Sequence, residues 1–110
     1  MRKILVVDDE LSVREALRII LKDTYQIVVM DCAEAGLEYL KSHEVDLVFL
    51  DILMPGMSGL EALKIIKARP DPPEVVIVTA TRTVKNAVDA MKHGAFEYVT
   101  KPFDVDEIKL

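Results

Sequence analysis

The sequence predicts an α/β fold, a doubly wound five-stranded parallel sheet, from two observations. Short apolar runs rich in Val and Ile recur five times, and segments with the spacing of amphipathic helices lie between them. Strict alternation of strand and helix implies right-handed crossovers, which make the strands parallel and place helices on both faces. The chain has 110 residues and 51% hydrophobic content, the size and composition of one domain.

The expected strands are apolar runs of four residues, which suit strands buried on both faces of a sheet. They span residues 4–7, 27–30, 47–50, 75–78 and, more weakly, 96–99.

The expected helices carry their apolar residues on one face, around residues 13–21, 33–40, 60–66 and 84–91. Four residue pairs with capping-box spacing predict where helices begin. These pairs are Ser12 with Glu15, Asp31 with Glu34, Ser58 with Glu61, and Asp104 with Glu107. The last segment, DVDEIKL, supplies only two turns, so the fifth helix is expected to be truncated.

Composition excludes several classes of protein. The sequence has no run of 18 uncharged apolar residues, and its start turns acidic after four of them, so we expect a soluble, cytoplasmic domain without a membrane span. The single cysteine, Cys32, has no internal disulfide partner and is expected to be a small core residue. The net charge of −5 argues against direct nucleic acid contact.

Polar residues follow four of the expected strands. Asp8 and Asp9 come after the first, Asp51 after the third, Thr79 after the fourth, and Lys101 shortly after the fifth. Because ligands of open parallel sheets bind at the carboxyl ends of the strands, we expect these side chains to converge on one edge.

This set of residues indicates phosphate chemistry. Carboxylates about 4 Å apart repel by about 1 to 4 kcal/mol per pair, so a cation must compensate. An oxygen-only ligand set suits Mg²⁺, which leaves room for a substrate phosphate. With Lys101 as a fixed positive charge and Thr79 as a hydroxyl donor, the pocket would receive a transferring phosphoryl group, and Asp51 would be either its nucleophile or a metal ligand.

The stretches VVDDE, LVFLDILMPGMSG, VVIVTA and EYVTKPF resemble, in order and spacing, the signatures of the receiver domain of two-component response regulators. The resemblance covers residues 1–110 and implies a flavodoxin-like (βα)5 fold with strand order 2-1-3-4-5. It implies that Asp51 is the phospho-acceptor and that a phosphohistidine of a sensor histidine kinase is the donor. The domain would catalyse its own phosphorylation and dephosphorylation and would not turn over external substrates.

The resemblance also implies the remaining site residues. Mg²⁺ would be held by Asp8 or Asp9, by Asp51 and by the backbone carbonyl of Leu53, with Asp9 the more direct ligand. Lys101 would pair with the phosphate or with Asp51.

A conformational switch is implied as well. Thr79 would turn its hydroxyl onto the phosphoryl oxygens, Tyr98 would turn inward, and the change would reach the face formed by the fourth helix and fifth strand. The Lys101–Pro102 bond is expected to be cis. Leu53 and Thr81 stand where this family tunes access of hydrolytic water, and the apolar Leu53 predicts slow dephosphorylation.

The resemblance extends to the protein as a whole. We expect a receiver at the N-terminus of a longer protein, joined to an ATPase and DNA-binding output region as in enhancer-binding transcription activators. We also expect that the protein can form a homodimer.

Other functions stay open from the sequence. A haloacid-dehalogenase-type phosphatase also uses a strand-end Asp with Mg²⁺, but it has a second Asp two residues on, where this chain has Leu53. A flavin-binding module would need a phosphate loop rich in Ser, Thr and Gly, where this chain has DDELSVRE. A receiver that serves only as an interaction module, without phosphorylation, is the third alternative.

Overall fold

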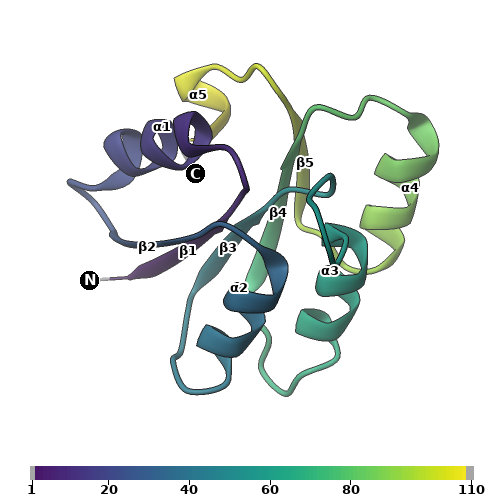
Figure 1. Ribbon diagram of the computed structural model, residues 1–110, viewed down its shortest axis with the longest axis horizontal. Helices are drawn as coiled ribbons and strands as arrows, with labels where there is room; N and C mark the ends of the chain where they lie inside the picture. The colour runs from purple at the N-terminus through teal and green to yellow at the C-terminus, as the bar shows by residue number, and fades with distance from the viewer. Residues whose placement is uncertain (1, 109–110) are drawn as a thin grey trace.

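The computed structural model describes residues 2–108 and contains one parallel sheet with strand order β2-β1-β3-β4-β5 (Figure 1). This confirms the predicted fold class and strand order. The strands are β1 (Lys3–Val7), β2 (Gln26–Met30), β3 (Leu47–Leu50), β4 (Glu74–Thr79) and β5 (Glu97–Thr100). The helices are α1 (Leu11–Leu21), α2 (Ala33–Leu40), α3 (Gly59–Lys67), α4 (Val84–Lys92) and α5 (Val105–Ile108).

Helices cover both faces of the sheet, as the alternating pattern predicted. Helices α2, α3 and α4 pack on one face, and α1 and α5 pack on the other (Figure 1). Successive side chains of a strand point to opposite faces, so β1 contributes Leu5 and Val7 to the first layer and Ile4 and Val6 to the second. This double burial explains why the central strands are apolar throughout.

The register of the sheet aligns the carboxyl ends of its strands. Val7 at the end of β1 pairs with Met30 of β2 and with Leu50 of β3, and Thr79 of β4 pairs with Thr100 of β5. The turns that lead from helices back into strands lie at the opposite, amino-terminal edge, including residues 68–73 between α3 and β4. The two edges of the sheet therefore carry different kinds of connection.

Two of the four predicted helix caps are confirmed. The Ser58 hydroxyl accepts the amide of Glu61 at the start of α3, and the Glu107 carboxylate accepts the amide of Asp104 before α5. The predicted caps at Ser12 and Asp31 are wrong. Residues Glu10 and Cys32 hold the N-cap positions of α1 and α2, and neither side chain caps its helix.

Two further expectations need correction, and part of a third falls outside the described residues. Strand β5 begins at Glu97 rather than at residue 96, and the Phe96 side chain is 57% exposed at the sheet's amino-terminal edge. Cys32 is half-buried rather than part of the core, because it holds the N-cap position just before the first turn of α2. Lys109 and Leu110, which belong to the expected fifth helix, lie outside the described residues.

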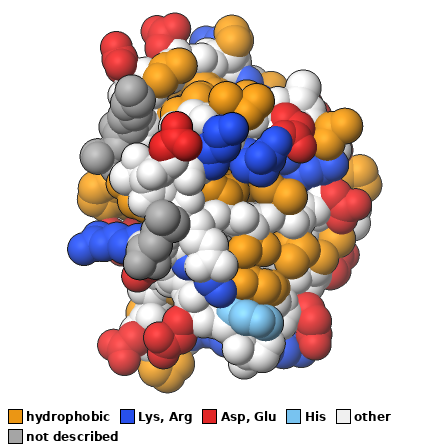
Figure 2. Space-filling model, turned by 90° about the vertical axis from the view of Figure 1, so that its left-hand side faces the viewer, with side chains coloured by type: hydrophobic (Ala, Val, Ile, Leu, Met, Phe, Trp, Pro, Cys, Tyr) orange, Lys and Arg blue, Asp and Glu red, His pale blue; other side chains and the backbone are white. Residues whose placement is uncertain are grey.

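The surface mixes side chains of different kinds. Seen from the left-hand side of Figure 1, hydrophobic, basic and acidic groups alternate, without a large field of one sign (Figure 2). Within residues 2–108, no helix has the length and apolar character needed to cross a membrane.

Candidate phosphoryl-transfer site

The site is built where the sheet's hydrogen-bond ladder runs one residue beyond the strands. The amide of Asp8 donates to the carbonyl of Met30, the amide of Asp51 to that of Val7, and the amide of Lys101 to that of Thr79. These bonds fix the backbone of three polar residues at the carboxyl edge of the sheet. Their side chains consequently start from the same edge of the sheet, at the ends of β1, β3 and β5.

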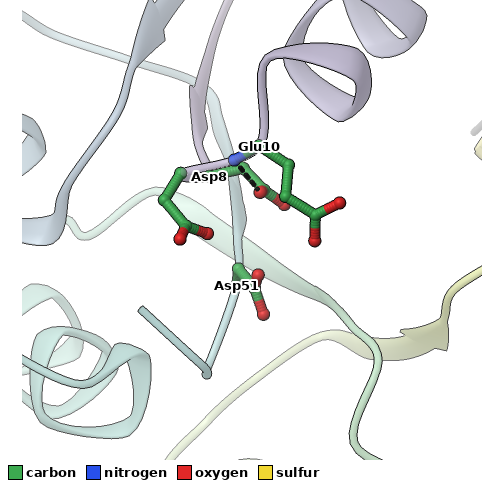
Figure 3. Close-up of side chains that lie close together, drawn as sticks. Asp8, Glu10 and Asp51 are labelled. Atoms are coloured by element: carbon green, nitrogen blue, oxygen red, sulfur yellow. Dashed lines mark hydrogen bonds between the residues drawn. The ribbon is translucent and has the colours of Figure 1, made fainter. Parts of the chain in front are cut away.

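The ammonium group of Lys101 lies at the centre of this cluster. Its Nζ is 2.9 Å from Oδ2 of Asp8, 3.0 Å from Oδ2 of Asp51 and 3.1 Å from Oε1 of Glu10. Figure 3 shows the Asp8, Glu10 and Asp51 side chains close together, with the backbone amide of Glu10 bonded to Asp8. One cation therefore meets three carboxylates.

Burial differs sharply among these partners. The side chains of Asp8 and Asp51 are 3% exposed and that of Lys101 is 10% exposed, whereas that of Glu10 is 55% exposed. Two of the three carboxylates thus depend on the protein for their solvation, and the third is solvated by water.

This arrangement changes two acid–base equilibria. Burial raises the pKa of Asp8, and the charge of Asp51 adds to the rise, although bonds from Lys101 and from the Glu10 amide oppose it. Burial alone would lower the pKa of Lys101, but the carboxylates of Asp8, Asp51 and Glu10 more than offset this and raise it above its ordinary value. Lys101 is therefore positively charged at neutral pH.

Four acids of this edge could hold a metal ion. Carboxylate oxygens of Asp8, Asp9, Glu10 and Asp51 all lie within 4.8 Å of one another. Oxygens on opposite sides of a magnesium ion are about 4.2 Å apart, because each Mg–O bond is about 2.1 Å long. The donor set is thus of the right kind and near the right span for a hard divalent cation.

The loop after β3 presents Asp51 to this cluster. The Leu53 amide donates to Oδ1 of Asp51 over 3.1 Å, and the Gly59 amide closes the loop onto the carbonyl of Ile52. A Cβ atom on Gly59 would overlap the carbonyl oxygen of Asp51. Gly56, at φ = 80°, adopts the left-handed conformation that glycine permits. Both glycines are therefore needed for this backbone path.

Thr79 and Tyr98 belong to a neighbouring network. Thr79 is fully buried, and its hydroxyl accepts a long, 3.5 Å bond from the amide of Thr81. The Tyr98 hydroxyl donates to the carbonyl of Thr81 over 2.9 Å. Burial raises the pKa of Tyr98, so its hydroxyl keeps its proton and acts as a donor. The network ties the segment after β4 to β5.

Two more side chains hold this segment. The Asn86 side-chain amide donates to the Thr81 hydroxyl, and Arg82 donates to the carbonyl of Lys101. The Lys101–Pro102 bond is cis, as expected.

The expected convergence of polar side chains on one edge of the sheet is seen in the structure, and their roles stay predictions. Asp8, Asp51 and Lys101 are in direct contact, and Thr79 lies on the adjacent strand. Asp9 is exposed and joins the same carboxylate cluster. Glu10 was missed, because its contact with Lys101 depends on where α1 begins. Arg82 and Asn86 were missed too, because no motif marks them.

Comparison with known families identifies the domain. The family model for the response regulator receiver domain matches residues 4–110. The chain belongs to this receiver domain family. Receiver domains of response regulators are phosphorylatable signalling switches, and the chain is a domain of that kind.

Individual relatives resemble the receiver domain over nearly its whole length. The chemotaxis protein CheY of Listeria monocytogenes is 40% identical across 98% of this chain and 92% of its own. The regulatory protein AtoC of Escherichia coli is also 40% identical across 98% of this chain, which spans only 24% of AtoC. The chain spans 44% of LytT, a sensory transduction protein of Bacillus anthracis, and thus less than half of that relative.

Solved structures agree with the fold. A CheY-like receiver domain from Methanospirillum hungatei has a TM-score of 0.91 and 28% identity, covering 98% of this chain and 87% of its own. Membership of the receiver family favours a signalling switch over the phosphatase and flavin-module alternatives. The clustered carboxylates after β1 agree with this, because they would repel a flavin phosphate.

Proposed function

We propose that Asp51 is the phospho-acceptor of this receiver domain and that its donor is a phosphohistidine of a sensor histidine kinase. The observation that carries this proposal is the contact of the buried Asp51 carboxylate with Lys101 at the carboxyl edge of the sheet. A carboxylate held there has a fixed cation beside the position that a phosphoryl group would enter.

The transfer exchanges one bond for another. An oxygen of Asp51 attacks phosphorus, the P–N bond of the donor breaks, and its electron pair leaves with the imidazole, which takes up a proton. The amide of Leu53 orients the Asp51 carboxylate through Oδ1. Lys101 neutralises negative charge on the phosphoryl oxygens as they approach.

Magnesium is the proposed cofactor. Asp8, Asp9 and Asp51 would hold it together with the backbone carbonyl of Leu53, and the span of the carboxylate cluster supports this assignment. Bound there, the ion would neutralise charge between the carboxylates and the phosphoryl oxygens.

Thr79 and Tyr98 are the proposed switch. After transfer, the Thr79 hydroxyl would bond the phosphoryl group in place of its long contact with the Thr81 amide. Movement of the segment after β4 would break or redirect the hydrogen bond that the Tyr98 hydroxyl donates to the Thr81 carbonyl. The aspartyl phosphate shifts the equilibrium only by its preference for the arrangement that brings Thr79 and Lys101 closer.

The wider protein is part of the proposal. Residues 1–110 would form the N-terminal receiver of a longer cytoplasmic regulator with an ATPase and DNA-binding output region, and a homodimer would be one of its states. The short span of AtoC and LytT that the chain covers supports an attached output region.

Phosphorylation by acetyl phosphate tests the acceptor. The wild-type domain should gain one phosphoryl group in the presence of Mg²⁺, as measured by intact mass, and Asp51→Asn should gain none. Modification that persists in Asp51→Asn would move the acceptor to another residue. Turnover of small phosphomonoesters would instead favour a phosphatase.

The lifetime of the phosphoryl group is a separate expectation. The Leu53 side chain is 56% exposed two residues after Asp51, where an apolar group would hinder attacking water. Slow dephosphorylation is therefore expected, and a half-life of seconds in the isolated domain would contradict it.

A further inference from the structure

We propose that Glu10 is a placeholder for the phosphoryl group. In the resting domain its carboxylate accepts the N–H of Lys101 that a phosphoryl oxygen accepts after transfer. The inference rests on the proposed function of Asp51 and adds a residue that regulates access to it. It begins from the contact between Nζ of Lys101 and Oε1 of Glu10, at 3.1 Å.

Lys101 has no donor to spare in the resting state. An ammonium group carries three N–H donors, and Asp8, Asp51 and Glu10 each supply one carboxylate oxygen within 3.1 Å of it. A phosphoryl oxygen can bond Lys101 only after one of these contacts opens. The identity of the contact that opens determines how readily the phosphoryl group enters.

Burial selects Glu10 as the partner that leaves. Asp8 and Asp51 are almost fully buried, so in the metal-free domain releasing either would leave an unpaired charge away from water. Glu10 is 55% exposed, and water solvates its carboxylate as soon as it departs. Opening the Glu10 contact therefore costs least.

The position of Glu10 in α1 supports a role outside its own helix. Glu10 holds the N-cap position, where Ser, Thr, Asp and Asn are the residues that stabilise a helix. Its side chain makes no capping bond, and its backbone amide is anchored to Oδ1 of Asp8. The side chain reaches Lys101 instead. Figure 3 shows the Glu10 side chain extending near those of Asp8 and Asp51.

Glu10 acts through Lys101 and is a positioning residue. Its removal should speed capture of a phosphoryl group, because Lys101 then has a free donor. We expect Glu10→Gln to accept phosphate from acetyl phosphate about two- to fivefold faster, the range that corresponds to a partly exposed ion pair.

Two variants separate the contact from its charge. Glu10→Asp keeps the charge but is one methylene shorter, and at an N-cap its carboxylate is expected to accept helix amides instead. It should be accelerated like Glu10→Gln. Glu15→Gln removes the same charge from an exposed site of α1, where Glu15 pairs with Arg18, and should stay within 1.5-fold of wild type.

The decisive experiment measures initial rates of phosphorylation at fixed ionic strength and saturating Mg²⁺, in these variants and again with Lys101→Met. With Lys101→Met, the Glu10→Gln substitution should lose its effect, because the two residues act as a pair. If Glu10→Gln speeds phosphorylation equally in the Lys101→Met background, its effect is only a loss of charge repulsion, and the proposal is overturned. A Glu10→Asp rate equal to wild type would overturn it independently.

Magnesium binding provides a readout besides the transfer. A placeholder predicts that Glu10→Gln changes the Mg²⁺ dissociation constant, measured by calorimetry, less than threefold. A loss of tenfold or more would make Glu10 a metal ligand and overturn the proposal. If wild type takes up no phosphoryl group, the proposed function fails along with the placeholder; if it does and Glu10→Gln is no faster, the placeholder alone fails.

Discussion

Lys101 shows how far single residues can be predicted from the sequence. Asp8, Asp51 and Lys101 follow apolar runs of a parallel sheet, so their meeting at one edge could be predicted from strand positions alone. Glu10 could not, because its place depends on where α1 begins and on a choice between capping that helix and reaching Lys101. Such a choice between two partners leaves no mark in the spacing of the sequence.

The raised pKa of Asp8 has a consequence for stability. From its ordinary value of 3.8 up to the raised value, the folded domain holds more protons than the unfolded chain, so stability falls as the pH rises through that window. Asp8→Asn removes this cost. In metal-free buffer we expect the variant to be more stable than wild type at pH 7, as measured by urea unfolding.

The pH dependence provides the control for this prediction. The advantage of Asp8→Asn should shrink as the pH is lowered through the raised pKa of Asp8 toward 3.8, because the folded wild-type carboxyl group then takes up a proton and no longer buries a charge. A difference that stays constant with pH would point to packing rather than to the buried charge.

At the scale of elements, the start of α3 carries a sharp prediction. Replacing glycine by alanine near a helix start is ordinarily neutral or stabilising by up to about 1 kcal/mol. Gly59→Ala should instead destabilise the domain by about 3 kcal/mol or more, because the new methyl group would overlap the carbonyl of Asp51. Chemical denaturation would measure this.

The adjacent residue is a matched control. Ser58→Ala removes only the capping bond to the Glu61 amide, so it should cost about 1 kcal/mol. Equal losses for the two variants would show that the loop after Asp51 can shift to accept a side chain.

The segment between β4 and α4 carries a second prediction at this scale. Tyr98→Phe removes the hydrogen bond to the Thr81 carbonyl and should cost about 1 kcal/mol. The backbone amides of residues 80–83 should exchange their hydrogens faster with solvent.

Tyr39→Phe is the control for that measurement. It also removes a bonded hydroxyl, the acceptor of Nζ of Lys3, but at the opposite edge of the sheet. Exchange at residues 80–83 should be unchanged in this variant. If the amides of residues 80–83 stay protected from hydrogen exchange in Tyr98→Phe, the contacts of Arg82 and Asn86 hold this segment instead.

The elements themselves were predicted unevenly. The apolar runs of β1, β3 and β4 are unambiguous because these strands are buried on both faces. Helix starts were less certain: the capping pattern of Ser12 predicts that the helix begins after this residue, but α1 begins at Leu11 and contains Ser12 in its first turn. Thr83 caps α4 through the Asn86 amide without the Glu or Gln that completes a capping box, so it was not predicted.

For the whole molecule, alternation of strands and helices specified parallel strands but not their order. Local periodicity does not state which strands are neighbours, and the order β2-β1-β3-β4-β5 was expected only through the resemblance to receiver domains. The observed order places β1 and β3 side by side, which brings Asp8 next to Asp51.

Metal binding should stabilise the whole domain. A ligand that binds only the folded state adds about 2.7 kcal/mol at a hundred times its dissociation constant. For a domain of this size, such a gain raises the melting temperature by about 10 °C or more. We expect Mg²⁺ to produce this shift in thermal unfolding, EDTA to reverse it, and Asp51→Asn to reduce it.

The turn at residues 68–73 lies at the amino-terminal edge of the sheet, while Asp8, Asp51 and Lys101 lie at the carboxyl edge. A fluorescent dye or short peptide tag inserted in that turn would have the full length of the strands between itself and the acidic cluster. The domain could thus be built into a biosensor whose reporter leaves the chemistry undisturbed.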